Sequence, residues 1–260
     1  MDSLTFYKYQ GTGNDFVIVD NRDLSFTKKD AKTIARICDR RFGIGGDGFI
    51  LLENNAHLDF NMVYFNSDGN ESTMCGNGGR CIVSFAHFLG IFEKQTTFNA
   101  IDGKHDAVVN DDGTISLQMI DVNKVDDNRD YCFTNTGSPH HVQLVADLDN
   151  YPVVEEGRKL RHKVYGDDGA NINFVQPISH GTYKVRTYER GVEDETYSCG
   201  TGVTAVALAM HATSHTTNTN VSLVTPGGEL SVRFVNKDNG YTDIWLSGPA
   251  QQVFKGNINI

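Results

Sequence analysis

The pattern of apolar and polar positions predicts strands in both halves of the chain. Short runs in which apolar residues alternate with polar ones, bounded by Gly, Asn and Asp, are typical of half-buried strands. In the first half, strands are expected at residues 4–9, 16–20, 49–52 and 59–65, with several short ones within 96–119. In the second half, they are expected at residues 141–145, 173–176, 182–188, 221–225, 229–235 and 242–246.

Three segments have helical patterns. Residues 27–40 form an amphipathic pattern that Thr27 can cap. Residues 80–89 and 203–211 are apolar on more than one face, which indicates helices enclosed by other structure. We therefore expect an α+β fold in which a curved, mainly antiparallel or mixed sheet wraps around a central helix.

Landmarks of the first half recur in the second. The offset is 124 or 125 residues for Gly13 and Gly137, Phe49 and Phe174, Asn66 and Arg190, Cys75 and Cys199, and Gly103 and Gly228. Glycine is common, but a constant spacing in constant order argues against chance. The chain thus contains a duplication, with two pseudo-symmetric domains predicted at residues 1–121 and 122–260 and the boundary in the polar stretch 121–130.

The two cysteines of the repeat open matching phrases. Cys75-Gly76-Asn77-Gly78 and Cys199-Gly200-Thr201-Gly202 each precede a predicted helix. Free N–H groups and the partial positive charge of a helix start favour a thiolate and can hold a carboxylate. Buried, inert thiols are the alternative, because free cysteine is among the most buried residue types. The matched context favours a pair of acid–base thiols around one anionic substrate.

Composition excludes several classes of partner. A net charge of -10 argues against nucleic acid and against an anionic membrane surface. Five cysteines without dense spacing do not resemble a secreted disulfide framework, and no signal peptide or membrane-length apolar run is visible. A cytoplasmic setting is expected. We expect no metal site, because His211 and His215 lack an acidic third ligand.

Two further motifs favour structural roles. Residues 43–48 match the letters of a dinucleotide-binding loop, but they follow a helix and precede a strand, the reverse of what pyrophosphate binding needs. A helix-to-strand turn is the better interpretation. Cys38, Cys81 and Cys132 lie in apolar segments and are expected to be buried and inert.

At these motifs the chain resembles the diaminopimelate epimerase family over its whole length. The resemblance rests on Gly11-Thr12-Gly13-Asn14-Asp15-Phe16, Asn66-Ser67-Asp68-Gly69, the phrase from Cys75 to Cys81, Glu189-Arg190-Gly191 and the phrase from Cys199 to Gly202. It implies epimerisation of LL-2,6-diaminopimelate to meso-diaminopimelate without pyridoxal phosphate or another cofactor, in lysine and peptidoglycan precursor biosynthesis. It also implies an active site in the interdomain cleft and a homodimer.

The resemblance also assigns roles to residues. Cys75 and Cys199 would be the catalytic bases, supported by His140 and Glu189. The substrate-binding residues would be Asn14, Asn66, Gly76, Asn77, Asn171, Arg190, Gly200 and Thr201. Two features depart from common members: Ser138 replaces an asparagine, and the stretch from Glu189 to Cys199 is one residue longer.

Two fixed thiols suit inversion of an α-carbon, because one removes a proton while the other returns one on the opposite face. A coupled pair sharing one proton, helped by the substrate ammonium or by His140, is expected. A proline racemase-like isomerase is one alternative, although it would leave Asn66, Asn171 and Arg190 without a purpose. A dithiol redox or regulatory protein and a non-catalytic carboxylate-binding module remain as others.

Overall fold

The computed structural model describes residues 3–28 and 30–259, and the chain divides into two compact units. The first unit comprises the chain up to Leu117 together with the stretch from Pro249 onward. The second unit is Gln118–Gly248. Each unit has its own sheet and its own buried helix.

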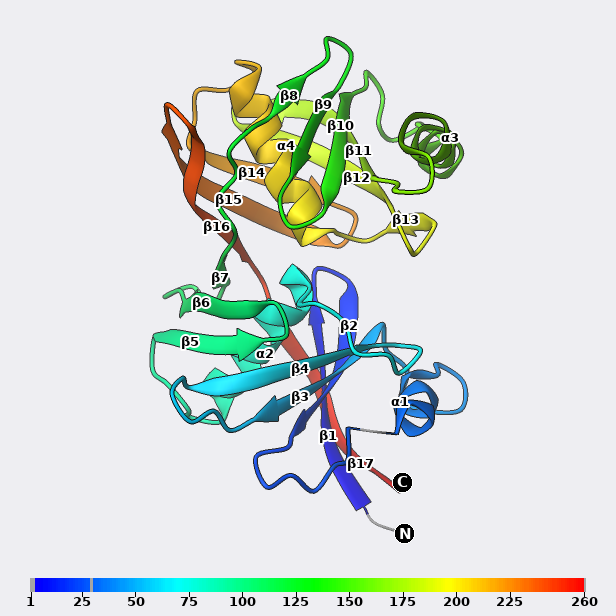
Figure 1. Ribbon diagram of the computed structural model, residues 1–260, viewed down its shortest axis with the longest axis vertical. Helices are drawn as coiled ribbons and strands as arrows, with labels where there is room; N and C mark the ends of the chain where they lie inside the picture. The colour runs from blue at the N-terminus through cyan, green and yellow to red at the C-terminus, as the bar shows by residue number, and fades with distance from the viewer. Residues whose placement is uncertain (1–2, 29, 260) are drawn as a thin grey trace. The chain divides into compact units, whose positions relative to one another are not determined.

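The first unit is a mixed sheet with a helix against each face (Figure 1). Its strands are β1 (Ser3–Gly11), β2 (Asn14–Asp20), β3 (Gly48–Glu53), β4 (Phe60–Asn66), β5 (Gln95–Ala100), β6 (Gly103–Val109), β7 (Ile115–Gln118) and β17 (Gln251–Asn259). They pair in the order β17-β1-β2-β3-β4-β5-β6-β7, and only the β2–β3 and β4–β5 pairs are parallel.

The two helices of this unit occupy opposite faces of its sheet. Along β3, Phe49 and Leu51 point into the cluster that contains Ile34 and Ile37 of α1 (Ala31–Cys38). The alternate residue Ile50 lies near Gly78 of α2 (Gly76–Phe88). The period of two along a strand thus explains why β3 is apolar at every position but its last, since it is covered on both faces.

The second unit repeats this plan. Its strands are β8 (Asp126–Asp127), β9 (Cys132–Asn135), β10 (Pro139–Leu144), β11 (Asn171–Ser179), β12 (Thr182–Glu189), β13 (Asp194–Thr196), β14 (Asn220–Thr225), β15 (Gly228–Lys237) and β16 (Gly240–Gly248). The chain of pairs runs β8-β9-β10-β11-β12-β14-β15-β16, with β10–β11 and β12–β14 parallel and β13 attached to β12.

The helix α4 (Gly200–Ala212) is the centre of the second unit. Strands β9–β12 and β14–β16 all contact it, and residues 202–210 are buried (Figure 1). This confirms the expectation, from the apolar run at residues 203–211, of a helix enclosed by other structure. The other helix, α3 (Val153–Tyr165), lies against β11, β12 and β13, and only Val153 and Gly157 of it are fully buried.

The same succession of pairs occurs in both units, which confirms the predicted duplication. Apart from the short strands β8 and β13, each unit begins with two antiparallel strands and a helix, after which a third strand pairs in parallel with the second and a fourth pairs antiparallel with the third. The helix that a cysteine precedes comes next. A fifth strand then pairs in parallel with the fourth, and two antiparallel strands follow it. The α+β class and the mixed, mainly antiparallel sheet are also as predicted.

The structure corrects two predicted boundaries. The compact units divide after Leu117 rather than after residue 121, and the C-terminal strand β17 belongs to the first unit instead of the domain predicted at 122–260. The reason is pairing, because β17 lies antiparallel along β1 from Ser3↔Asn259 to Gln10↔Gln251. The helix predicted at 27–40 is shorter, since Asp30 and not Thr27 caps it, and Lys29 lies outside the described residues.

Candidate active site

The first thiol lies at the start of α2. Cys75 has extended backbone angles (φ -96°, ψ 138°), and its carbonyl oxygen accepts a hydrogen bond from the Gly79 N–H at 2.8 Å. It is therefore the N-cap, and its Sγ accepts a hydrogen bond from the Gly78 N–H at 3.4 Å. The half-buried sulfur consequently lies where helical N–H groups are unpaired within the helix and negative charge is stabilised.

Three predicted substrate-binding residues lie beside this thiol. Asn14, at the start of β2, has its Oδ1 3.6 Å from Cys75 Sγ and accepts a hydrogen bond from Asn77 Nδ2 at 3.3 Å. Asn77 and Gly76 are the first residues of α2 and are buried. The structure thus brings together Asn14, Cys75, Gly76 and Asn77, all within the first unit.

Arg80 is a neighbour of this group that the sequence analysis did not assign to the site. Its side chain is fully buried, and it donates to Asn77 Oδ1 at 2.9 Å, Thr12 Oγ1 at 3.1 Å and the Gly76 carbonyl oxygen at 3.3 Å. No carboxylate of residues 3–28 and 30–259 lies within ion-pair distance of it. The available signal was an arginine inside an otherwise apolar helical run, because a charged side chain is rarely buried without a specific purpose.

The second thiol stands at the equivalent place in the second unit. Cys199 is the extended N-cap of α4 (φ -123°, ψ 114°), and its carbonyl oxygen accepts from Val203 N at 2.9 Å. Its buried Sγ lies 3.4 Å from Thr201 Oγ1. Gly202 is required here, because a Cβ would come within 2.5 Å of Asn173 Oδ1. Both cysteines of the repeat therefore have the predicted helix-start position.

His140 is tied to this second thiol through Thr201. Its Nε2 lies 2.9 Å from Thr201 Oγ1, and its Nδ1 lies 3.2 Å from Asn173 Nδ2. Asn173 must present its amide NH2 to Nδ1, because its Oδ1 accepts from the Thr187 hydroxyl and its Nδ2 also donates to the His141 carbonyl oxygen. His140 is thus the neutral tautomer with its proton on Nε2.

Burial fixes His140 in that neutral form. Complete burial, together with the charge of Arg190, lowers the pKa of the imidazole to about 3. A neutral imidazole supplies no positive charge at neutral pH, so the expectation that His140 helps to balance a thiolate charge is wrong. What it can supply is an N–H hydrogen bond to the Thr201 hydroxyl, which in turn can donate to Cys199 Sγ.

Asn171 and Ser138 extend the same network. Asn171 Nδ2 donates to Ser138 Oγ at 3.1 Å, and Ser138 Oγ lies 3.0 Å from His140 Nε2 and 3.2 Å from Thr201 Oγ1. Asn171 Oδ1 accepts from the Arg190 backbone N–H at 2.9 Å. Ser138 stands where common members of the family that the chain resembles have asparagine. It is therefore part of the hydrogen-bond network around Cys199.

The turn after β12 presents Glu189 and Arg190. Glu189 ends β12, and its carbonyl oxygen accepts from the Glu193 N–H at 2.8 Å. The exposed Arg190 donates from Nη1 to the Asp168 carbonyl oxygen at 2.8 Å. It forms no ion pair with a carboxylate of the described chain, so its guanidinium retains donors for a ligand.

No side-chain hydrogen bond of the described chain links Asn66 to the residues around Cys75 or to those around Cys199. Asn66 ends β4, its side chain is exposed, and it forms no side-chain hydrogen bond within the part of the chain that the structure describes. Its backbone N–H donates to the Asn70 carbonyl oxygen at 2.9 Å.

The remaining thiols match the buried, inert roles expected for them. Burial raises the pKa of Cys38 to about 12 and that of Cys132 to about 11, and it also raises the pKa of the fully buried Cys81. These thiols stay protonated at neutral pH. His211 lies in the last turn of α4 with Nδ1 3.1 Å from Tyr241 OH, while His215 lies beyond the helix.

No three His, Cys, Asp or Glu side chains among residues 3–28 and 30–259 come together as a metal site. No helix with described structure combines the length and apolar character needed to cross a lipid bilayer.

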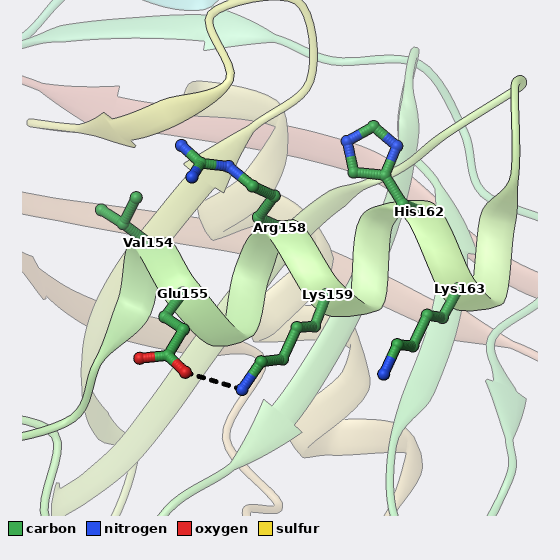
Figure 2. Close-up of a pocket in the computed structure, with 6 residues that line it drawn as sticks. All are labelled: Val154, Glu155, Arg158, Lys159, His162 and Lys163. Atoms are coloured by element: carbon green, nitrogen blue, oxygen red, sulfur yellow. Dashed lines mark hydrogen bonds and ion pairs between the residues drawn. The ribbon is translucent and has the colours of Figure 1, made fainter.

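A surface hollow over α3 is distinct from the predicted site residues. All of its lining residues come from this one helix: Val154, Glu155, Arg158, Lys159, His162 and Lys163. Figure 2 shows these side chains spreading outward from the helix, with Lys159 paired to Glu155 at 2.8 Å. A hollow on one convex, mostly charged helix provides no converging set of polar groups of the kind a small-molecule site needs.

Comparison with known proteins agrees with this geometry. A family model described as "Diaminopimelate epimerase" matches residues 6–125 and 132–253, one segment for each half of the duplication. The diaminopimelate epimerase of Flavobacterium psychrophilum is 54% identical over 98% of this chain and all of its own length. That of Aquifex aeolicus is 38% identical over 98% of both chains.

Solved structures of low sequence identity share the fold. A PhzF-family phenazine biosynthesis protein of Bacillus anthracis has a TM-score of 0.81 at 15% identity, covering all of both chains. A hydroxyproline epimerase of Agrobacterium vitis has a TM-score of 0.71 at 13% identity, over 99% of this chain and 91% of its own. The full-length identities, the family match to both halves and the two helix-start cysteines lead to one conclusion: the chain belongs to the diaminopimelate epimerase family.

Proposed function

We propose that this protein epimerises LL-2,6-diaminopimelate to meso-diaminopimelate by proton transfer between two thiols, without a cofactor. The observation that carries the proposal is the equivalence of Cys75 and Cys199, each the extended N-cap of a buried helix in one of two duplicated units. Family membership supports the same substrate and reaction.

Cys75 and Cys199 act on opposite faces of the same α-carbon. One sulfur, as thiolate, removes the α-proton, and the other, as thiol, delivers a proton from the opposite side, which inverts the centre. The reverse reaction uses the same groups with their protonation states exchanged. Serine cannot replace either cysteine, because its hydroxyl is far less acidic than a thiol.

The two helix starts hold the reacting carboxylate. Gly76 and Asn77 in one unit, and Gly200 and Thr201 in the other, supply N–H donors that are not used within their helices. Negative charge moves onto this carboxylate as the α-proton leaves. Donors that are already oriented stabilise that charge without reorganisation, which is the main electrostatic contribution to such a step.

The charge balance favours one thiolate at a time. A free thiol has a pKa of about 8.5, so ionisation at pH 7 costs about 2 kcal/mol. A helix end returns about 0.3–1 kcal/mol, and about 2 in a partly buried site. This is marginal for one thiolate and insufficient for two. With His140 neutral, the substrate ammonium is the cation that stabilises the thiolate in a pair that shares one proton.

Arg190 and three asparagines recognise the distal end of the substrate. A planar guanidinium binds a carboxylate through two parallel hydrogen bonds, and Arg190 has donors left for this after its contact with Asp168. Asn14, Asn66 and Asn171 supply amides for the remaining amino-acid groups. Glu189 supports the reacting centre from the end of β12.

We extend the proposal to a cytoplasmic homodimer. The family resemblance supports the dimer, and a biosynthetic role together with a net charge of -10 supports a cytoplasmic setting without nucleic acid or membrane partners. Light scattering of the purified protein that gives the mass of one chain would contradict the dimer.

Exchange of the α-proton with solvent tests the function directly. The purified protein is incubated with LL-diaminopimelate in deuterated buffer, and exchange and inversion are followed by NMR. Wild-type protein should do both, whereas Cys75→Ser and Cys199→Ser should lose inversion. Proline and hydroxyproline serve as alternative substrates, and exchange with either of these but not with diaminopimelate would instead indicate a proline racemase-like enzyme.

A protein of the redox or binding class would exchange no α-proton of any amino acid. Cys38→Ser is the matched control, because it removes a buried thiol of the first unit that has no place in the proposed reaction. Loss of activity only in the variants of Cys75 and Cys199 would tie the chemistry to the two helix starts.

A further inference from the structure

A chain of two side-chain amides passes Cys75 and ends on a charged group at each side. Arg80 Nη2 donates to Asn77 Oδ1 at 2.9 Å, and Asn77 Nδ2 donates to Asn14 Oδ1 at 3.3 Å. Asn14 Nδ2 then donates to Asp47 Oδ2 at 2.6 Å. All four residues belong to the first unit, and Asn14 Oδ1 is the atom that lies 3.6 Å from Cys75 Sγ.

The two ends determine which way each amide faces. A guanidinium has only donors, so the atom of Asn77 that faces Arg80 must be its oxygen, and its NH2 group then faces Asn14. An ionised carboxylate has only acceptors, so the atom of Asn14 that faces Asp47 must be its NH2 group. Both requirements agree, and they leave the Asn14 oxygen directed at Asn77 and Cys75.

The ends of the chain are themselves firmly held. Arg80 is fully buried among Thr12 Oγ1, the Gly76 carbonyl oxygen and Asn77, all of them neutral acceptors. Burying a guanidinium in this way is unfavourable, so its retention calls for a function beyond packing. At the other end, Asp47 Oδ1 accepts from Arg40 Nη2 at 2.7 Å, and Asp47 Oδ2 accepts from the Asp15 N–H at 3.3 Å.

We propose that Arg80 and Asp47 are positioning residues that fix the amide orientation of Asn77 and Asn14, so that Asn14 presents its carbonyl oxygen to Cys75. Neither residue belongs to the site residues predicted from the sequence. The inference deepens the proposed function and rests on it for its kinetic consequence, because Asn14 with its oxygen toward Cys75 accepts a hydrogen bond from the S–H group of the resting thiol and so aligns the sulfur.

Redundancy is the distinctive consequence of this arrangement. If Asp47 is replaced by Asn, Arg80 still orients Asn77, and Asn77 still orients Asn14. If Arg80 is replaced by Gln, Asp47 still orients the chain from the other side. Only when both ends are replaced by amides, which can donate or accept, does the orientation of Asn14 become free. Residues 47 and 80 should therefore couple although no contact joins them.

A double-mutant cycle measures this coupling. Asp47→Asn and Arg80→Gln should each lower kcat/KM by no more than about tenfold. The double variant should lose at least about tenfold beyond the product of the two single effects. Loss of the Arg80 charge affects the single and the double variant alike and cancels in the cycle. A double variant that equals the product overturns the inference.

Matched variants separate orientation from simple loss of an ion pair. Arg80→Lys keeps a group that can only donate, so combining it with Asp47→Asn should give no coupling. Arg40→Gln removes the ion pair between Arg40 and Asp47 but leaves the hydrogen bond that Asp47 accepts from Asn14. This variant should therefore keep kcat/KM within about twofold of wild type. A loss in Arg40→Gln equal to that in Asp47→Asn would assign the effect to the ion pair and overturn the proposal.

Two readouts do not need epimerase activity. Neutron diffraction from deuterated wild-type crystals distinguishes oxygen from ND2, and an Asn14 ND2 group directed at Cys75 would refute the inference even if no Arg80 variant folds. Site-resolved alkylation followed by mass spectrometry should show a changed rate ratio of Cys75 to Cys199 in the double variant beyond the product of the singles. A wild-type protein inactive on diaminopimelate would end the proposed function, while these two readouts would still decide the inference.

Discussion

Thr201 joins a buried imidazole to a thiol: its hydroxyl oxygen lies 2.9 Å from His140 Nε2 and 3.4 Å from Cys199 Sγ. Because Nδ1 of His140 is occupied by the Asn173 amide, the ring must donate from Nε2. The imidazole therefore acts through the Thr201 hydroxyl as a neutral donor. Its neutrality has a cost at low pH that can be measured.

His140→Gln should flatten the acid dependence of stability. The pKa of His140 falls from 6.5 to about 3 on folding, so the unfolded state binds a proton that the folded state excludes. Its stabilisation is complete above pH 6.5 and is lost as pH falls toward 3, at about 1.4 kcal/mol per pH unit for each proton. His141, with a pKa of about 4, adds a second such group.

Urea denaturation between about pH 7 and pH 5 checks this prediction. In the variant, the free energy of unfolding should change with pH by about one proton's worth less than in wild type, whatever its absolute stability. Some pH dependence should remain, because His141 still contributes. Acid limbs of equal slope in both proteins would show that His140 is not kept neutral by the fold.

Arg190→Lys should lose most activity although it keeps the positive charge. An ammonium cannot reproduce the two parallel hydrogen bonds of a guanidinium to a carboxylate, and we expect kcat/KM to fall about 10–100-fold. Arg22→Lys is the control, since Arg22 pairs with Asp20 at the surface of the first unit and should retain wild-type turnover. Steady-state kinetics with LL-diaminopimelate decide the matter, and equal kcat/KM for Arg190→Lys and wild type would remove Arg190 from substrate recognition.

Glu193→Gln should raise KM clearly while it changes the free energy of unfolding only slightly. The Glu193 carboxylate accepts hydrogen bonds from Arg161 Nε at 3.0 Å, Tyr188 OH at 3.0 Å and Gly191 N at 3.1 Å, and so holds the turn that carries Arg190. The group is partly exposed, so the loss of stability should stay below about 1 kcal/mol. KM for diaminopimelate should rise several-fold as the turn loses its support.

The control for Glu193 is Glu155→Gln on the outer face of α3. Glu155 pairs with Lys159 near the surface and does not contact the turn after β12, so KM should not change. If both variants leave KM at the wild-type value, the Glu193 carboxylate does not position Arg190.

Gly157→Ala should destabilise the second unit, against the usual gain of about 0.5–1 kcal/mol for this change inside a helix. A Cβ at position 157 would lie 2.4 Å from Tyr188 Cβ, which is far closer than any real contact. Separating α3 from β12 should cost about 1–3 kcal/mol. Gly78→Ala is the comparison, because its Cβ would meet Ile50 Cδ1 at an ordinary 3.4 Å, and chemical denaturation should place the two variants on opposite sides of wild type or leave Gly78→Ala unchanged.

Local patterns were sufficient to predict most of the strands, the buried helices α2 and α4 and the duplication. They failed for α3, because that helix carries few apolar residues among many charged ones and only Val153 and Gly157 of it are fully buried. They also failed for β17, whose residues are mostly exposed and show no alternation between buried and exposed positions. Its place beside β1 depends on pairing between distant parts of the chain, which a local pattern does not encode.

The candidate site divides in the same way. Cys75 and Cys199 were identified by their matched phrases, and their helix-start positions are as predicted. The orientation of Asn14 and the tautomer of His140 follow from Arg80, Asp47 and Asn173, which come from other elements. The protonation state of a side chain and the direction of its hydrogen bonds depend on the residues that surround it in the fold. The sequence alone does not show which residues these are.

The place of β17 along β1 has a consequence for biosynthesis. During translation, the first unit emerges from the ribosome without the strand that borders β1, and that strand follows only after the whole second unit has been made. The row of backbone groups on β1 that β17 covers stays open in the interval. Nascent chains stalled within the second unit should therefore hold an incomplete first sheet, and release of the strand from Gln251 onward is the event that closes it.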